Sequence, residues 1–376
     1  MTSLQPELAD LPISRWGALP TFLDRYSLDV RSLALFRMGL ALILLVDLFM
    51  PAGAVLIAQP MMRGILALLL AIASVAMLFG YHSRLATVAA WILLMALHSG
   101  PSLLAVGSVD WLKITMGWAM LLPLGAAYSA DRAMNTALRP VPLRILSGAT
   151  MALMAQACFI SAVFAYAFWS LWSTSRTLES QGSDPAFEVI ALLVVALEII
   201  GPLLLWSPFG NSACRMVAVV TFVIFHGGLG LTTSLGLLPF AIAIIWLAFI
   251  PTSAWERLSS SVYRSKPSGF QRTGLKIYYD ADCGFCKKVV HLIRMLLVLP
   301  HTPLATAQSL PEINEAMETQ NSWVIVDWKG QPHYKFEGIA YVVSLSPVFA
   351  AFASVLRWRP LMTVGTHGYE WIATHR

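Results

Sequence analysis

The fold of the C-terminal part of this chain is best predicted from residues 278–286, which read Tyr278-Tyr279-Asp280-Ala281-Asp282-Cys283-Gly284-Phe285-Cys286. Just before it, apolar and polar residues alternate from Leu275 to Tyr279, which predicts a half-buried strand. After it, apolar residues recur at helical spacing from Val289 to Leu297. The two cysteines of this CxxC motif are therefore expected at a helix N-terminus, where unpaired backbone N–H groups and the helix dipole stabilise a thiolate.

The two cysteines have different predicted roles. Cys283 lies nearer the helix start and the solvent, so we predict it to be the attacking thiol, and Cys286, one turn further in, to be the resolving thiol. Lys287 adds positive charge beside the pair, while Asp280 and Asp282 oppose it. We predict these three charged residues to support the reactive pair.

A zinc site is the main chemical alternative for the same residues. Cys283, Cys286 and His291 could be three ligands of a zinc ion, but a structural site needs a fourth, usually from a second closely spaced pair. The only other cysteines, Cys158 and Cys214, lie far away in apolar runs. We therefore predict dithiol redox chemistry and no metal. A purely structural or vestigial cysteine pair is the remaining alternative.

The segment from Tyr279 to Cys286, together with the C-terminal run from Tyr369 to Arg376, resembles the DCC family of thiol-disulfide oxidoreductases. This resemblance covers roughly residues 273 to 376 and implies a small thioredoxin-like domain. The family more often has glycine where this chain has Ala281. Thioredoxins also place a cis-proline before their third strand, whereas Asn321-Ser322 stands there in this chain.

The downstream pattern predicts the element order β, α, β, α, β, β, α, which is that of a thioredoxin-like fold. The predicted elements after the first strand and helix are Leu304–Ala307 (strand), Pro311–Thr319 (helix), Trp323–Asp327 (strand), a turn at Lys329-Gly330, His333–Phe336 (strand), and helices over Glu337–Leu345, Val348–Trp358 and Gly368–Thr374.

The composition of the whole chain indicates an integral membrane protein. Of its 376 residues, 57% are hydrophobic and 12% charged, against about a quarter charged in soluble domains. Nearly all of the apolar excess precedes Pro251. The predicted domains are a lead-in (residues 1–30), a transmembrane domain (31–252), a linker (253–272) and the redox domain (273–376).

We expect a polytopic α-helical membrane bundle of about eight transmembrane helices with a C-terminal α/β thioredoxin-like domain. Most of the apolar runs approach the roughly 20 residues that a helix needs to cross a bilayer. The third and the last run are the weakest. The runs are Ser32–Met50, Met62–Gly80, Leu85–Leu97, Trp111–Tyr128, Leu146–Trp172, Phe187–Trp206, Ala213–Leu231 and Leu235–Ile250.

The basic residues predict the orientation of this bundle. An even number of spans places both ends on one side, and cytoplasmic segments carry the excess of Lys and Arg. With both ends inside, the outer loops hold Arg63, Lys113 and Arg176, and the inner segments hold Arg15, Arg25, Arg31, Arg84, Arg132, Arg139, Arg144, Arg215, Arg257, Arg264 and Lys266. We predict a multi-pass protein of a bacterial-type inner membrane with both termini and the CxxC domain cytoplasmic. Because the cytoplasm keeps thiols reduced, a reductase, relay or sensor fits better than an oxidase.

The membrane part contains short motifs in a fixed order, namely Ser32 to Gly39, Gly107 to Leu112, Leu122 to Asp131, Phe222 to His226 and Leu237 to Phe240. In this order they resemble the HTTM domain, the module shared with vitamin K-dependent gamma-carboxylases. The resemblance covers roughly residues 25 to 252, and fusions of this module with a DCC domain are known in bacterial sequences.

Four ionisable residues lie in the apolar runs and are candidate functional residues, because charge inside a bilayer is costly. They are Arg37, Asp47, Glu198 and His226. Arg37 and Asp47 stand ten residues apart on one predicted helix and cannot pair directly. The sequence alone establishes no cofactor. A quinone or other lipid-like molecule is the kind of ligand that such residues would hold. The alternative is that Glu198 and His226 only join helices through hydrogen bonds.

Gamma-carboxylation itself is not expected. The resemblance implies an intramembrane lysine as the base, yet the only lysine before Lys266 is Lys113, at the outer edge of another helix. The expected position falls at Trp169 or Ser170.

The first functional hypothesis is a membrane-tethered thiol-disulfide oxidoreductase. Its partners would be the lipid bilayer and a disulfide-bearing protein or small thiol. Nucleic acid is not expected, because the net charge of +5 comes largely from arginines that flank apolar runs. The second hypothesis is a non-catalytic membrane scaffold or peptide-export accessory with a redox-sensing CxxC. A transporter is disfavoured because the two halves of the membrane part show no internal repeat.

Overall fold

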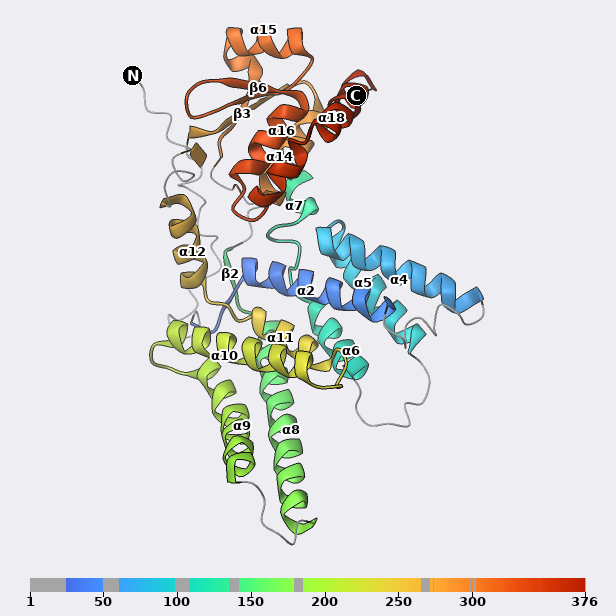
Figure 1. Cartoon of the computed structure of the whole chain (residues 1–376), viewed down its shortest axis with the longest axis vertical. Coiled ribbons are helices and arrows are strands. Elements are labelled where there is room, and N and C mark those ends of the chain that lie inside the picture. The colour runs from blue at the N-terminus through green and yellow to red at the C-terminus, as the bar shows by residue number, and fades with distance from the viewer. Residues whose placement is uncertain are drawn as a thin grey trace. The chain divides into compact units, whose positions relative to one another are not determined.

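The computed structural model describes residues 25–49, 61–98, 108–134, 142–178, 185–264, 271–272, 274–297, 299 and 302–375. The chain divides into two compact units, which we treat separately (Figure 1). The helical unit holds the described residues up to 127 and from 142 to 255. The C-terminal lobe holds the described residues 128–134 and 256–375. Parts of the predicted lead-in (1–30) and linker (253–272) lie outside the described residues.

The helical unit is built from apolar helices with a continuous core. A short pairing of β1 (Leu28–Asp29) with β2 (Arg144–Ile145) is its only sheet among the described residues. The helices are α2 (Val30–Phe49), α4 (Met61–Phe79), α5 (Ser83–Leu97), α6 (Ser108–Ala119), α8 (Gly148–Leu178), α9 (Pro185–Leu203), the 3-10 turn Leu204–Trp206, α10 (Asn211–Thr232) and α11 (Leu238–Leu247).

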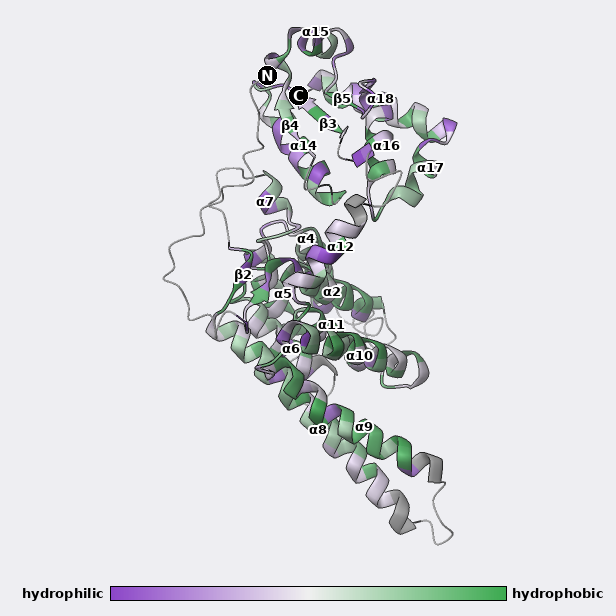
Figure 2. Cartoon of the chain, turned by 90° about the vertical axis from the view of Figure 1, so that its left-hand side faces the viewer, coloured by the Kyte–Doolittle hydropathy of each residue, from purple (hydrophilic) through white to green (hydrophobic). Residues whose placement is uncertain are grey.

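Eight transmembrane helices are not confirmed. In the described parts of the chain, five helices are long and apolar enough to cross a membrane, namely α2, α4, α8, α9 and α10. A sixth span would need α11 and α12 (Thr252–Arg264) together, although they are bent by 83°. Helix α5 has 15 residues and α6 has 12. Figure 2 shows that apolar residues dominate along α9 and α10.

Helix α6 ends well short of the predicted Tyr128. The chain turns after Ala119 and reaches Pro123, which lacks a backbone N–H and disfavours helical geometry in the residue before it. Hydropathy alone does not detect this end, because Leu121, Leu122 and Leu124 continue the apolar run.

Several segments that lie far apart in the sequence meet within the helical unit. The guanidinium of Arg215 donates to the carbonyls of Ser27 (2.9 Å) and Phe249 (3.2 Å). Ser32 Oγ donates to the carbonyl of Ile250 at 2.7 Å. Together with the β1–β2 pairing, these bonds join the segment before α2, the segment before α8, the start of α10 and the end of α11.

The C-terminal lobe contains a four-stranded sheet between helices. Its elements are β3 (Lys276–Tyr279), α14 (Gly284–Leu296), β4 (Leu304–Thr306), a 3-10 turn (Ala307–Ser309), α15 (Pro311–Gln320), β5 (Val324–Val326), β6 (Pro332–Tyr334), α16 (Lys335–Leu345), a 3-10 turn (Ala350–Phe352), α17 (Ala353–Leu356) and α18 (Arg359–His375). The short helix α7 (Ala130–Met134) packs against α14 in the same unit.

The sheet has the strand order β4-β3-β5-β6. Strand β3 is parallel to β4 and antiparallel to β5, which is antiparallel to β6. One face packs Ile277 and Ile325 against Val290 of α14 and Val342 of α16, while Tyr278 of the other face packs with Met317 of α15. The predicted element order β, α, β, α, β, β, α is confirmed. The predicted helix at Val348–Trp358 is shorter, and the last helix begins at Arg359 instead of Gly368.

Candidate functional site

The CxxC motif lies where β3 passes into α14. Cys283 is the N-cap of α14, and its sulfur accepts a hydrogen bond from the backbone N–H of Cys286 at 3.1 Å. The two sulfurs are joined as a disulfide, and the Cα atoms are 5.2 Å apart. A sulfur in the N-cap position satisfies one of the unpaired N–H groups of the first turn, which is also where a thiolate gains most from the helix dipole.

The two sulfurs differ in exposure. Cys283 is half-buried, whereas Cys286 is 6% exposed and belongs to the buried face of α14. Phe285 stands between them with half of its surface exposed. A partner can therefore reach Cys283 first, and Phe285 offers it an apolar contact beside the disulfide.

A side chain that the sequence did not point to braces the loop before the cysteines. Gln308, from the 3-10 turn after β4, donates to Asp280 Oδ1 at 2.7 Å and accepts from the N–H of Ala281 at 3.1 Å. Asp280 Oδ1 also accepts from the N–H of Asp282 at 3.1 Å. The only sequence signal for Gln308 is its place directly after the second strand, since parallel strands end at the same edge of a sheet.

Two of the three predicted supporting residues take part in this loop. Asp280 has the role just described, whereas the Asp282 side chain is exposed and contributes its backbone N–H. Lys287 is exposed on the first turn of α14, and its N–H donates to the carbonyl of Cys283 at 3.1 Å. The structure therefore places Lys287 next to the pair.

His291, the third residue of the alternative zinc set, packs edge-on against Tyr279 with ring centroids 6.4 Å apart. Partial burial, followed by the charges of Arg294 and Lys287, lowers its pKa to about 4. Among the described residues, no group of three or more His, Cys, Asp or Glu side chains is placed to hold a metal ion.

The loop before β5 occupies the position where thioredoxins have a cis-proline. Here Ser322 Oγ accepts from the N–H of Lys335 at 2.7 Å and lies 3.2 Å from the hydroxyl of Tyr369. That hydroxyl also accepts from the N–H of Trp323 at 3.3 Å. The C-terminal helix thus holds this loop through hydrogen bonds.

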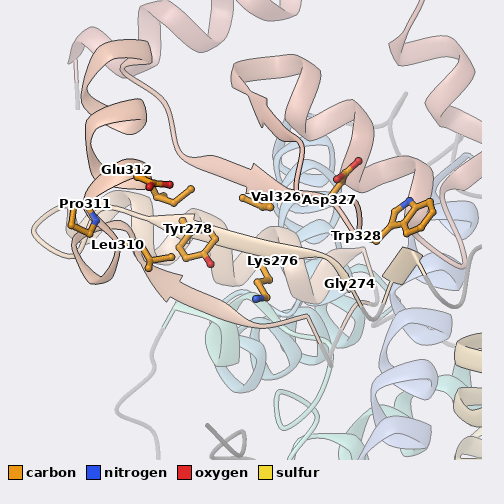
Figure 3. A pocket seen from close by; sticks show the side chains of 11 residues that line it. Gly274, Lys276, Tyr278, Leu310, Pro311, Glu312, Val326, Asp327 and Trp328 are labelled. Carbon is orange, nitrogen blue, oxygen red and sulfur yellow. The ribbon is translucent and has the colours of Figure 1, made fainter. Parts of the chain in front are cut away.

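A pocket of about 670 Å³ lies on the α15 face of the sheet (Figure 3). Its wall includes Lys276 of β3, Glu312 at the start of α15 and Asp327 after β5. The lining runs along β3 from Gly274 to Tyr278, and neither Cys283 nor Cys286 belongs to it.

The four ionisable candidates of the membrane part fall into separate places. Arg37 is fully buried and donates to the carbonyls of Leu124 (2.6 Å) and Ala127 (3.4 Å). Asp47 lies 3.9 Å from His98 Nε2. As predicted, Arg37 and Asp47 contact different partners.

Glu198 and His226 are brought together. A carboxylate oxygen of Glu198 on α9 lies 3.5 Å from His226 Nε2 on α10, and both side chains are fully buried. His226 Nδ1 lies 3.2 Å from the carbonyl of Phe222, one turn earlier. The buried hydroxyl of Ser161 on α8 is a further polar neighbour that favours the Glu198 carboxylate. Within the described residues, neither carboxylate oxygen nor Nε2 has a partner in good hydrogen-bond geometry. Sequence spacing could not show this pairing, because it depends on how two helices pack.

A disulfide at a helix N-terminus, after the first strand of the β4-β3-β5-β6 sheet, is the arrangement of a CxxC redox domain. Residues 277–376 match the protein family described as DCC1-like thiol-disulfide oxidoreductase. The match covers 100 of the 376 residues, so it identifies the domain rather than the whole chain. The predicted DCC domain is confirmed, whereas the HTTM resemblance of the helical unit stays a prediction. No curated protein and no solved structure matches the chain significantly.

Proposed function

We propose that this protein is a membrane-tethered thiol-disulfide oxidoreductase with a thioredoxin-like redox domain and Cys283 and Cys286 as its reactive pair. The observation that carries the proposal is the difference between the two sulfurs. One caps the helix at a half-exposed position, and the other is buried one turn further along. This is the division between attacking and resolving thiols that stepwise disulfide exchange needs.

The reaction proceeds through a mixed disulfide. In the reduced domain, the Cys283 thiolate attacks a disulfide of the partner, which forms a Cys283–partner disulfide and releases one partner thiolate. The Cys286 thiolate then attacks the Cys283 sulfur, which closes the Cys283–Cys286 disulfide and releases the second partner thiol. Two electrons pass from the domain to the partner, and the reverse sequence oxidises the partner. The partner is a disulfide-bearing protein or a small thiol.

The lobe is proposed to face the cytoplasm of a bacterial-type inner membrane. The arginine excess in the predicted inner segments supports this orientation. The contacts in the helical unit are consistent with it, since Arg215, Ser32 and the β1–β2 pairing join predicted inner segments and the inner ends of predicted spans on one side. In the lobe, α7 comes from another predicted inner segment and packs on α14. In that compartment the enzyme would act as a reductase or relay.

The helical unit is proposed to hold a quinone or similar lipid-like molecule at Glu198 and His226. What supports this fit is the set of buried oxygens and nitrogen without a partner in good geometry, which a ligand carbonyl or hydroxyl would satisfy. A quinone would supply a two-electron acceptor, and Glu198 and His226 would hold the protons that accompany those electrons. Equilibrium binding of a short-chain ubiquinone to the full chain should weaken in Glu198→Leu and stay unchanged in Val220→Leu, a lipid-exposed position on α10.

The redox proposal is tested on the full chain in detergent or nanodiscs. Reduced Cys286→Ser protein treated with glutathione disulfide should trap a mixed disulfide on Cys283, visible by mass spectrometry, and Cys283→Ser should not. A Cys214→Ser control should behave as the parent does. The midpoint potential of the pair should fall within the range of known redox proteins, about −270 to −120 mV. If the cysteine pair neither exchanges disulfides nor changes redox state in the titration, the oxidoreductase proposal fails and the scaffold hypothesis remains.

A further inference from the structure

The C-terminal lobe carries an exposed apolar surface between α16 and α18. Over residues 348–358, the side chains of Val348, Phe352, Val355 and Trp358 are each 55–66% exposed, and Phe349 is 38% exposed. The segment folds as a 3-10 turn followed by the four-residue α17. Large apolar side chains gathered in this way on a soluble domain mark an interaction surface.

The charges around this surface are of one sign. Arg357 and Arg359 are exposed at its end, and the sequence contains no Asp or Glu between Glu337 and Glu370. By contrast, helix α15 of the same lobe exposes Glu312, Glu315 and Glu318. The lobe is therefore polarised, with an apolar and basic surface at 348–359 and an acidic one on α15.

Exposed tryptophan and phenylalanine next to arginine are typical of protein that lies in the headgroup region of a bilayer. The aromatic rings enter the boundary of the acyl chains, while guanidinium groups attract anionic headgroups. A protein partner could tolerate acidic side chains on this surface, whereas an anionic bilayer would repel them. The absence of Asp and Glu between Glu337 and Glu370 therefore favours a lipid surface.

The chain connects the lobe to the helices of spanning length through a short tether. Helix α12 begins in the helical unit at Thr252 and ends in the lobe at Arg264, and the eleven residues from there to the start of β3 at Lys276 reach at most about 40 Å. The five helices of spanning length precede that tether. Because the lobe is covalently attached to these helices, it experiences a high effective concentration of bilayer surface.

We propose that residues 348–359 form an interfacial segment that binds the surface of an anionic lipid bilayer and holds the redox domain against it. The apolar side chains enter the interface, and Arg357 and Arg359 contact lipid phosphates. The proposal is independent of the redox chemistry. It adds that the reactive pair works beside the membrane, on partners that reach it there.

The test uses the full chain in nanodiscs with and without phosphatidylglycerol. A bimane label is placed through Val355→Cys in a Cys158→Ser/Cys214→Ser background, with the Cys283–Cys286 disulfide kept closed so that it does not react. A nitroxide-bearing lipid serves as the quencher. The matched control carries the label through Glu318→Cys on the acidic helix α15. The label at 355 should be quenched at least about twofold, more strongly with phosphatidylglycerol, and the label at 318 should not.

Charge and apolar contributions are separated by two further variants. Arg357→Gln/Arg359→Gln should remove the dependence on phosphatidylglycerol, and Phe352→Ser/Trp358→Ser should reduce quenching in both lipids. An unquenched, water-exposed label at 355 overturns the proposal. A label that is shielded from water yet unquenched by lipid also overturns it, because protein then covers the surface, either the helical unit or a second copy of the chain.

Discussion

The hydroxyl of Tyr369, near the end of the chain, accepts a hydrogen bond from the backbone N–H of Trp323 at 3.3 Å. It also lies 3.2 Å from Ser322 Oγ, which in turn accepts from the N–H of Lys335. Tyr369 belongs to the C-terminal run that carries the DCC resemblance. This contact gives that residue a physical role, since it fixes the loop before β5 from outside the sheet.

We expect Tyr369→Phe to destabilise the lobe by about 1 kcal/mol, because the N–H of the buried Trp323 loses its acceptor while the ring packing remains. The measurement is the unfolding of the lobe within the full chain at increasing denaturant concentration, with susceptibility to a protease as the readout. Thr366→Val on the same helix is the matched control. Equal loss in both variants would mean that the contact contributes nothing specific.

The difference in exposure between the two cysteines predicts their reactivity. In the reduced protein at pH 7, iodoacetamide should modify Cys283 at least about tenfold faster than Cys286, since only the former is accessible at the helix N-terminus. Peptide mapping after timed alkylation measures both rates. Faster modification of Cys286 would contradict the assignment of attacking and resolving thiols.

The low pKa of His291 predicts acid sensitivity of α14. Its pKa in the folded lobe is about 4, lowered by partial burial and by Arg294 and Lys287, against 6.5 ordinarily. Below pH 6.5 the unfolded chain therefore binds a proton that the folded lobe does not, so stability is full above about pH 6.5 and falls as the pH drops towards 4. Hydrogen exchange of α14, corrected for intrinsic rates, should increase over this range. His291→Gln should flatten that increase, and an unchanged profile in the variant would contradict the role of His291.

Two helical glycines predict where α9 and α10 touch. A Cβ at Gly201 on α9 would collide with the ring of Phe222 on α10, whereas nothing described lies within 4 Å of a Cβ at Gly228. We expect Gly201→Ala to destabilise the helical unit by about 1–3 kcal/mol through overpacking. Gly228→Ala should be neutral or stabilising, by up to about 1 kcal/mol, because alanine favours helix. Thermal unfolding in detergent compares the two, and similar curves would rule out close packing at Gly201.

The two glycine sites differ in their surroundings. Gly227 and Gly228, directly after His226, are small enough to let another backbone approach, but they face open space among the described residues. Close approach occurs instead at Gly201, beside Pro202 in the last turn of α9. A small residue shows only that a helix can approach there, and the neighbouring side chain decides whether it does.

Local sequence patterns were enough to predict the element order of the lobe and the place of the cysteine pair. Alternation with period two and recurrence with period 3.6 are local signals, and Gly330, with a φ of +83°, lies in the predicted turn between β5 and β6. The CxxC could be placed at a helix N-terminus for the same reason. The lengths of the membrane helices could not be predicted as well, because apolar residues continue past the end of α6 through the turn at Pro123.

The contacts between side chains far apart in the sequence could be found only in the folded protein. Gln308 reaches Asp280 from 28 residues away, Tyr369 reaches Trp323 from 46, and Glu198 meets His226 from a neighbouring helix. These contacts depend on strand pairing and on helix packing, which place side chains by long-range geometry. No local periodicity encodes them, because each partner would fit its own helix or turn equally well without the other.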